Sequence, residues 1–225
     1  MRCDAMPVRS DDTVLSAAPS QQAALGAMVQ VCRWNTFISS LSFPPLREVD
    51  RAAIGRIAEV WGMIGEALWS NPRPLFTSLN FYKSYLADIG LDQILPALDR
   101  LFSSNQRALA PVSLSFEECE LTARGVSNIL SLLGSDSVSL SSLQQLSVGR
   151  NPWVVHGDTG PHIDRLVTVL KKASILRMLN VESSLGVFPM AALSEALCAS
   201  ACPLAAIKLA GSPVPPPLVR ATGRS

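Results

Sequence analysis

Short runs of alternating apolar and polar residues recur along the chain, and an apolar stripe with helical spacing follows most of them. One example is LSFEECELTARGVSNILSLL, residues 114–133. Its extended run has four apolar positions: Leu114, Phe116, Cys119 and Leu121. The residues from Val126 to Leu133 then follow the three- and four-residue spacing of an amphipathic helix. The pattern predicts a strand, a tight turn and a helix in one short unit.

The same extended pattern begins at six positions that lie between 28 and 38 residues apart. Each run follows the template L-x-x-L-x-L-x-x-N/C-x-L, in which a polar or cysteine residue precedes the last apolar slot. The six starts are Ile38, Phe76, Pro111, Leu143, Leu176 and Leu204. The run from Leu143 fills every slot, whereas Pro44 and Pro45 interrupt the run from Ile38. The recurrence indicates a repeating structural unit.

Stripes of apolar residues with helical spacing predict helices between these runs. The clearest stripes lie at 20–34, 50–69, 89–101, 126–133 and 163–170. We expect Ser20 to cap the first helix and Trp69 and Trp153 to lie in the core. Because helices alternate with short strands, the sequence predicts an α/β protein with a parallel sheet.

The runs and helices together resemble the ribonuclease-inhibitor-like class of leucine-rich repeats. The most family-like fragments are Cys119-Glu-Leu-Thr-Ala-Arg-Gly125 and LQQLSVGRN at 143–151, and the resemblance covers residues 36–214. It implies a solenoid of about five to six repeats, with strands on the concave side and helices on the convex side. The alternative is an ordinary α/β domain with unrelated strands, which does not explain the recurring template.

The domain organisation follows from this interpretation. We expect a flexible N-terminal segment over 1–19, a capping helix over 20–37, a leucine-rich-repeat domain over 38–214 and a Pro-rich tail over 215–225. The capping helix is expected because the first repeat of a solenoid otherwise exposes its core. The Asn/Cys slot, occupied by Cys119 in one run, is expected to satisfy buried backbone groups at the turn.

The sequence contains few residues in arrangements that could support catalysis. The only histidines, His156 and His162, lie in a Gly/Pro loop without the helical spacing of a zinc site. Glu117 and Glu118 are adjacent, and adjacent strand residues would point to opposite faces, so we expect no shared acid–base site. Phosphate-loop, nucleophile-elbow and zinc-protease motifs are absent from the sequence. We therefore expect a non-enzymatic protein with no cofactor, no metal and no small-molecule substrate.

Composition and charge narrow the choice of partner. The formal net charge is +1, which gives no bulk electrostatic reason to expect nucleic acid or an anionic membrane. The five cysteines form no even disulfide framework, and we expect Cys198 and Cys202 to be buried small side chains. No apolar run has the length of a membrane span. These features favour a cytoplasmic protein, and association with the cytoskeleton is left open.

The exposed positions of the predicted strands and the turns after them form columns of mixed charge and polarity. Such a surface, with an aromatic residue and two arginines, suits a protein partner. The candidate binding residues are Asn80, Tyr82, Lys83, Glu117, Glu118, Gln145, Arg150, Arg177, Met178 and Glu182. The sequence thus favours an interaction scaffold, a subunit or adaptor of a larger assembly. The alternative is a regulator of a small GTPase in which Arg150 or Arg177 touches the nucleotide-bound partner, and a ubiquitin-ligase or immune-receptor adaptor is a third option.

Overall fold

A computed structural model describes most of the region between residues 19 and 208. The described residues are 19–35, 39–43, 54–72, 76–103, 111–151, 160–182, 194–195, 197–198 and 203–208. Several predictions lie outside them: the segment 1–18, the start at Ile38, the surroundings of His156 and Trp153, and the tail 215–225.

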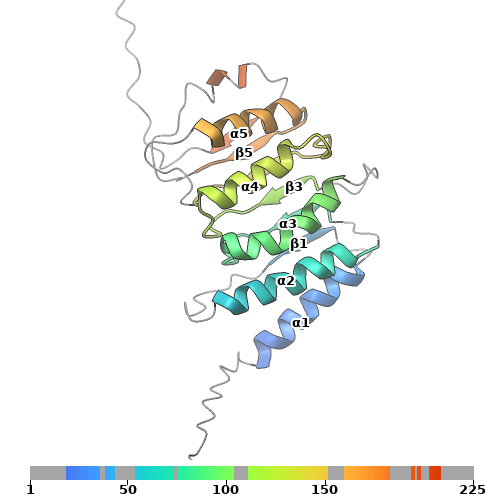
Figure 1. Cartoon of the computed structure of the whole chain (residues 1–225). Coiled ribbons are helices and arrows are strands. Elements are labelled where there is room, and N and C mark those ends of the chain that lie inside the picture. Colours follow the sequence, from blue (N-terminus) through green and yellow to red (C-terminus); the bar gives the residue numbers. More distant parts are fainter. Residues whose placement is uncertain are drawn as a thin grey trace, which may run out of the picture.

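The strands of the described residues form one parallel sheet whose spatial order equals their order along the chain. These strands are β1 (Ser40–Ser42), β2 (Ser78–Asn80), β3 (Ser113–Ser115), β4 (Gln145–Ser147), β5 (Met178–Asn180) and β6 (Ala206–Lys208). The helices are α1 (Pro19–Trp34), α2 (Ile54–Ser70), α3 (Ala87–Ser103), α4 (Ala123–Gly134) and α5 (Gly160–Lys172). The helices lie side by side in one layer over one face of the sheet (Figure 1). The predicted α/β class with parallel strands is confirmed.

The register of the sheet joins equivalent positions of neighbouring strands. One apolar residue at the centre of each strand pairs with its counterpart on the next: Leu41, Leu79, Leu114, Leu146, Leu179 and Ile207. The sequence template places these same residues at its fourth position, which is its second apolar slot. A slip by one residue would turn every apolar side chain to the opposite face, so the pattern fixes the register.

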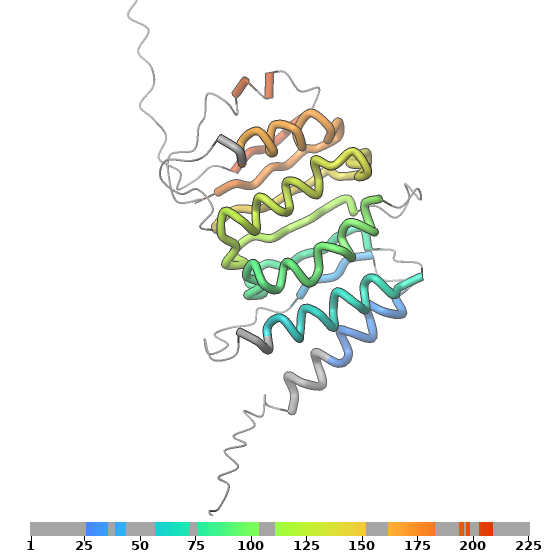
Figure 2. Tube along the Cα trace, viewed as in Figure 1, coloured from blue at the N-terminus to red at the C-terminus, as the bar shows by residue number. Residues whose placement is uncertain are grey.

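The core lies between the sheet and the helix layer. Phe43, Phe81 and Phe116 follow the ends of three neighbouring strands and stack on one another, with ring centroids 4.5 and 5.0 Å apart. Trp61 of α2 packs edge-on against Phe43 at 5.3 Å. Stacked aromatic rings add specific geometry to the large apolar area that they bury. Repetition of one slot along the sheet therefore builds a continuous core. The repeating elements follow one another along the molecule in chain order, from blue to red (Figure 2).

Several predictions about individual residues are wrong. Ser20 lies inside α1 and not before it, because the helix already begins at Pro19. Trp69 is 49% exposed, since its ring lies at the helix surface under Arg100, whose guanidinium is 5.4 Å from the ring centroid. Ile89 is 37% exposed although Leu91 and Ile94 of the same stripe are buried. Cys198 is exposed and not buried.

None of the helices in the described part of the chain combines the length and the apolar character that crossing a bilayer requires.

Candidate functional site

The turns that follow the strands are held by buried polar side chains. Asn151, only 1% exposed, accepts backbone hydrogen bonds from Cys119 (2.9 Å) and Leu121 (3.1 Å) through its Oδ1. Its Nδ2 donates to the carbonyl oxygens of Phe116 (2.7 Å), Val148 (3.0 Å) and Gly149 (3.1 Å). One amide therefore satisfies five backbone groups in two adjacent turns, as the Asn slot of the template predicts.

Cys119 and Ser84 do part of the same work in the two preceding turns. The Sγ of Cys119 donates to the carbonyl oxygen of Phe81 at 2.8 Å, and the Oγ of Ser84 donates to the same oxygen at 2.6 Å. Burial raises the pKa of the Cys119 thiol to about 12, so the group is protonated at neutral pH. The prediction that Cys119 is a turn residue agrees with these contacts.

Thiol reactivity gives a direct check on this assignment. Burial also raises the pKa of Cys32 to about 12, whereas Cys198 is exposed. Because alkylation requires an accessible thiolate, iodoacetamide at neutral pH should label Cys198 long before Cys119 or Cys32 in the folded protein. Peptide mass spectrometry over a time course measures the three rates. Equal labelling of Cys119 and Cys198 in the folded protein would contradict the assignment.

A row of alternating charges runs along the turns after β2, β3, β4 and β5. We call Lys83, Glu118, Arg150 and Glu182 the charge row. Lys83 Nζ lies 3.2 Å from Glu118 Oε2, and Arg150 lies 2.6 Å from Glu118 Oε1 and 3.0 Å from Glu182 Oε1. The first three members have left-handed backbone angles, with φ of 56°, 55° and 55°. The shared conformation places successive members side by side, so opposite charges meet.

Glu117 lies next to the charge row and does not point away from it. The prediction that Glu117 and Glu118 are strand residues on opposite faces is wrong, because β3 ends at Ser115 and both residues follow it in the turn. Glu117 Oε1 lies 3.6 Å from Arg150 Nε, and its Oε2 accepts from Asn180 Nδ2 at 2.9 Å. Arg150 thus forms ion pairs with three carboxylates, those of Glu117, Glu118 and Glu182.

The two cations of the charge row, Arg150 and Lys83, lower the pKa of Glu118. Burial pushes the pKa of Glu118 upward, but hydrogen bonds from Arg150 and Lys83 outweigh it and hold this pKa below its ordinary value of 4.5. The ion pairs with Glu118 therefore stabilise the fold at neutral pH, and this contribution is lost as the pH falls through the folded-state pKa.

Replacing Arg150 should reverse this shift. In an Arg150→Gln variant the pKa of Glu118 should rise, because burial remains while one of the two cations is lost. A carboxyl-carbon NMR titration measures the change. Arg177→Gln is the matched control, since Arg177 is exposed and forms no described ion pair, and it should leave the pKa of Glu118 unaltered. A Glu118 pKa that is unchanged in Arg150→Gln would show that the charge row does not control it.

The face of the sheet opposite the helices carries small and mostly uncharged side chains, and we call it the sheet face. The column before the central residues comprises Ser40, Ser78, Ser113, Gln145, Met178 and Ala206. The column after them comprises Ser42, Asn80, Ser115, Ser147, Asn180 and Lys208. Hydrogen bonds cross the strands, such as Ser113 Oγ to Gln145 Oε1 at 3.2 Å. Ser147 and Asn180 are buried, so the hydrogen-bonding groups that the face offers to a partner are mainly those of the other serines and Gln145. The face carries few bulky side chains.

The candidate binding residues fall into three groups. Gln145 and Met178 lie on the sheet face, and Arg177 is exposed directly before β5. Asn80 also lies there, but its Oδ1 accepts from the Tyr82 amide and its Nδ2 donates to Ser42, so its amide supports the local turn.

Tyr82 lies at the border between the sheet face and the charge row. Its ring is 4.9 Å from Lys83 Nζ, and 37% of the residue is exposed. The remaining candidates, Lys83, Glu117, Glu118, Arg150 and Glu182, are those that contact one another in and beside the charge row.

The serine columns and the contacts of Asn180 were not predicted from the sequence. Asn180 is 1% exposed, accepts from the Glu182 amide at 3.0 Å and bonds to Glu117. The sequence does carry a signal, since Asn80 and Asn180 occupy the same fifth position of their runs, and each accepts a hydrogen bond from the amide two residues ahead. No group of three or more histidine, cysteine or acidic residues converges in the described ranges in a way that could hold a metal ion.

Comparisons with known proteins bear on the fold. No protein-family model matches the chain, and no curated protein matches it. A solved structure titled "Leiomodin-1 Actin-Binding Site 2 (ABS2)" superposes with a TM-score of 0.51 and 16% sequence identity, and the match covers 80% of this chain and 90% of that chain. At this identity the likeness shows a shared α/β fold over most of both chains.

Proposed function

We propose that this protein is a non-enzymatic interaction module of the leucine-rich-repeat type, and that it binds a protein partner through the sheet face. The observation that carries the proposal is the pair of columns of small polar side chains across the strands. The in-register central leucines and the hydrogen bonds of Asn151, Cys119 and Ser84 at successive turns support the repeat assignment.

The chemistry of the sheet face favours a protein over other ligands. Serine and asparagine give adaptable hydrogen bonding at a low entropic cost, and short side chains leave room for a partner to approach the sheet closely. The neighbouring charge row pairs its cations internally, so it presents no unbalanced basic surface for a polyanion. Tyr82 and Met178 supply the larger contacts at which binding energy tends to concentrate.

The structural neighbour suggests a first partner to test. Its title describes an actin-binding site of leiomodin, and its fold covers most of this chain. We therefore include actin, in monomeric and filamentous form, among the candidate partners, with a cytoplasmic and cytoskeletal location as part of the proposal. A subunit or adaptor function in a larger assembly fits the same surface.

The proposal is tested by affinity purification of the tagged chain from its own cells, followed by mass spectrometry, and by co-sedimentation with actin. The test variant is the double substitution Ser113→Arg and Ser115→Arg, which places two bulky charges in the middle of the sheet face. We expect this variant to lose a partner that the unmodified chain recovers, because bulky charged side chains at the centre of an interface weaken the free energy of binding by several kcal/mol.

A matched control distinguishes obstruction of the sheet face from the mere addition of positive charge. Ser137→Arg with Ser141→Arg adds the same two charges at exposed positions between α4 and β4. This control should retain the partner, and both variants should match the thermal midpoint of the unmodified chain within a few degrees. Equal recovery by both variants would place binding elsewhere, and recovery of no partner by any form would refute the interaction function.

A further inference from the structure

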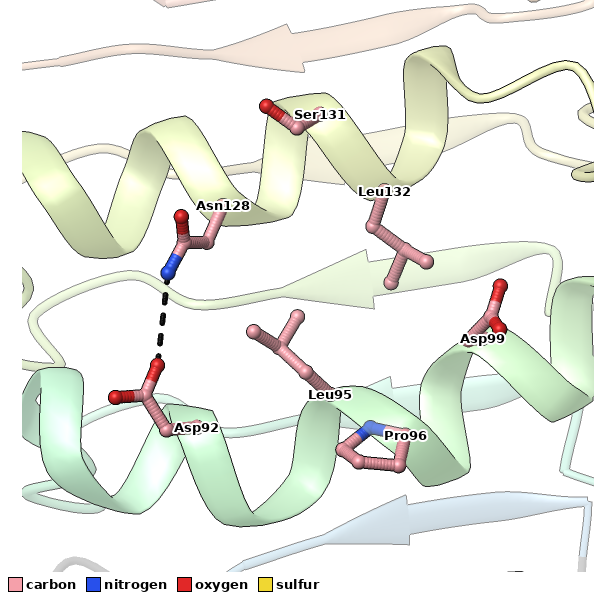
Figure 3. A pocket seen from close by; sticks show the side chains of 7 residues that line it. All are labelled: Asp92, Leu95, Pro96, Asp99, Asn128, Ser131 and Leu132. Carbon is pink, nitrogen blue, oxygen red and sulfur yellow. Dashed lines mark hydrogen bonds between the residues drawn. The ribbon is translucent and has the colours of Figure 1, made fainter.

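The helix layer contains a groove that the sheet-face proposal does not use. It lies between α3 and α4 and has a cavity volume of about 360 Å³. Its lining residues are Asp92, Leu95, Pro96, Asp99, Asn128, Ser131 and Leu132. Leu95 and Leu132 point into the space between the two helices, with Asp92 and Asn128 at one end and Asp99 at the other (Figure 3). The groove faces away from the sheet and is therefore a separate surface.

The α3 side of the groove is a stripe with acidic ends and an apolar middle. Asp92, Leu95, Pro96 and Asp99 are spaced at i, i+3, i+4 and i+7, which places them on one face of α3. The two carboxylates are seven residues apart, or roughly 10 Å along the helix axis. Leu95 and Leu132 are only partly buried, so the middle of the groove keeps apolar surface accessible.

The charge of the groove is only partly compensated within the protein. Asp92 forms an ion pair with Arg124 and accepts a weak hydrogen bond from Asn128 Nδ2 at 3.5 Å. Asp99 accepts a hydrogen bond from Ser103 Oγ at 3.0 Å, and within the described residues it forms no ion pair. A cation beside Asp99 would therefore meet a carboxylate that has only a neutral partner.

Pro96 interrupts the backbone hydrogen bonding of α3 beside the groove. A proline has no amide hydrogen, so the helical hydrogen bond that residue 96 would donate to the carbonyl oxygen of Asp92 is missing from α3. Helix interiors normally exclude proline for this reason, at a cost of about 3 kcal/mol. The carboxylates of Asp92 and Asp99 give the groove its acceptors, and Leu95 and Leu132 give it apolar surface. Its complement is therefore a pair of positively charged hydrogen-bond donors around an aliphatic side chain.

We propose that this groove binds an amphipathic helix of a protein partner, in which two basic residues seven positions apart flank a pair of aliphatic residues. The spacing of the partner reproduces that of the α3 stripe, so each basic residue meets one carboxylate while the aliphatic pair contacts Leu95 and Leu132. The proposal goes beyond the proposed function, because it assigns a second binding surface on the opposite layer of the protein.

The test uses a synthetic helical peptide as the probe. An alanine-based 16-residue peptide carries Arg, Leu, Leu and Arg at positions 5, 8, 9 and 12, and it is titrated into the isotope-labelled full chain by amide NMR. We expect saturable shifts in the amides of α3 and α4. Asp99→Asn should weaken binding about tenfold, and Ser131→Arg, which narrows the opposite wall, should abolish it.

Matched controls decide the outcome. A peptide with Glu in place of both arginines should give no saturable shifts, and the sheet-face variant Ser113→Arg with Ser115→Arg should bind the arginine peptide normally. Absence of saturable shifts, equal binding of the Glu peptide, or shifts confined to the sheet strands would each overturn the proposal. Concentration-dependent shifts without peptide would indicate self-association through the groove and would also overturn it. None of these results bears on the sheet-face proposal, which is tested separately by the serine-to-arginine variant.

Discussion

Replacing Asn151 with alanine should lower the free energy of unfolding by about 4 kcal/mol, more than most single substitutions do. The side chain is buried and bonds five backbone groups, two amides and three carbonyl oxygens. Alanine removes these hydrogen bonds and opens a small void. The carbonyl oxygen of Gly149 keeps the bond from the Glu118 amide at 3.2 Å, whereas each buried polar group that is left unpaired costs about 1–3 kcal/mol. Partial relaxation and entry of water keep the total below the sum.

Chemical denaturation measures this effect. The midpoint in urea should fall with little change in the slope, because the surface exposed on unfolding is nearly the same. Asn128→Ala is the matched control, since Asn128 lies on α4 with a single 3.5 Å contact to Asp92. Its expected effect is below about 0.5 kcal/mol. A loss for Asn151→Ala as small as that of the control would mean that the turns do not depend on this amide.

A Gly65→Ala substitution should destabilise the fold by about 3 kcal/mol, although alanine is the better helix former. A Cβ built on Gly65 of α2 would lie 2.4 Å from the carbonyl oxygen of Gln93 and 3.2 Å from its carbonyl carbon. Both atoms belong to the backbone of α3, so no side-chain rotation relieves the clash. The two helices would have to separate, and the aromatic packing of Trp61 would loosen with them.

Gly26→Ala is the matched control for this prediction. Gly26 lies in α1, and a Cβ there would meet no atom within 4 Å. The same substitution should therefore raise stability by about 0.5–1 kcal/mol through helix propensity alone. Thermal or urea unfolding of both variants gives the comparison. If the two substitutions changed stability in the same direction, the close approach of α2 and α3 would be refuted.

The sequence predicted the parts of the fold that depend on repetition. Leu79, Leu114 and Leu146 share one template slot and pair in register, because each lies on the only face of its strand that can be buried. The function of Asn151 at its turn was predictable for a related reason: its slot recurs where the chain leaves the strand, and a buried turn needs a partner for its backbone groups.

The parts that failed depend on contacts between distant residues. The sequence places Trp69 near the edge of a repeat unit, where a core position is expected, but it does not reveal that Arg100, from the next helix, covers its ring at the surface. The ion pair between Glu117 and Arg150 depends on where β3 ends and on the left-handed backbone of Glu118. The alternation of apolar and polar residues predicts neither feature. The groove between α3 and α4 arises from the relative positions of two helices and has no sequence motif.

The central claim, that the sheet face binds a protein partner, is tested most directly by hydroxyl-radical footprinting of the chain with its captured partner. Met178 and Tyr82 report on the sheet face and its border, and Met63 and Trp69 are exposed on the helix layer. The account predicts that the partner slows oxidation of Met178 and Tyr82 and leaves Met63 and Trp69 unchanged. Protection of Met63 and Trp69 with Met178 and Tyr82 still fully reactive would contradict it.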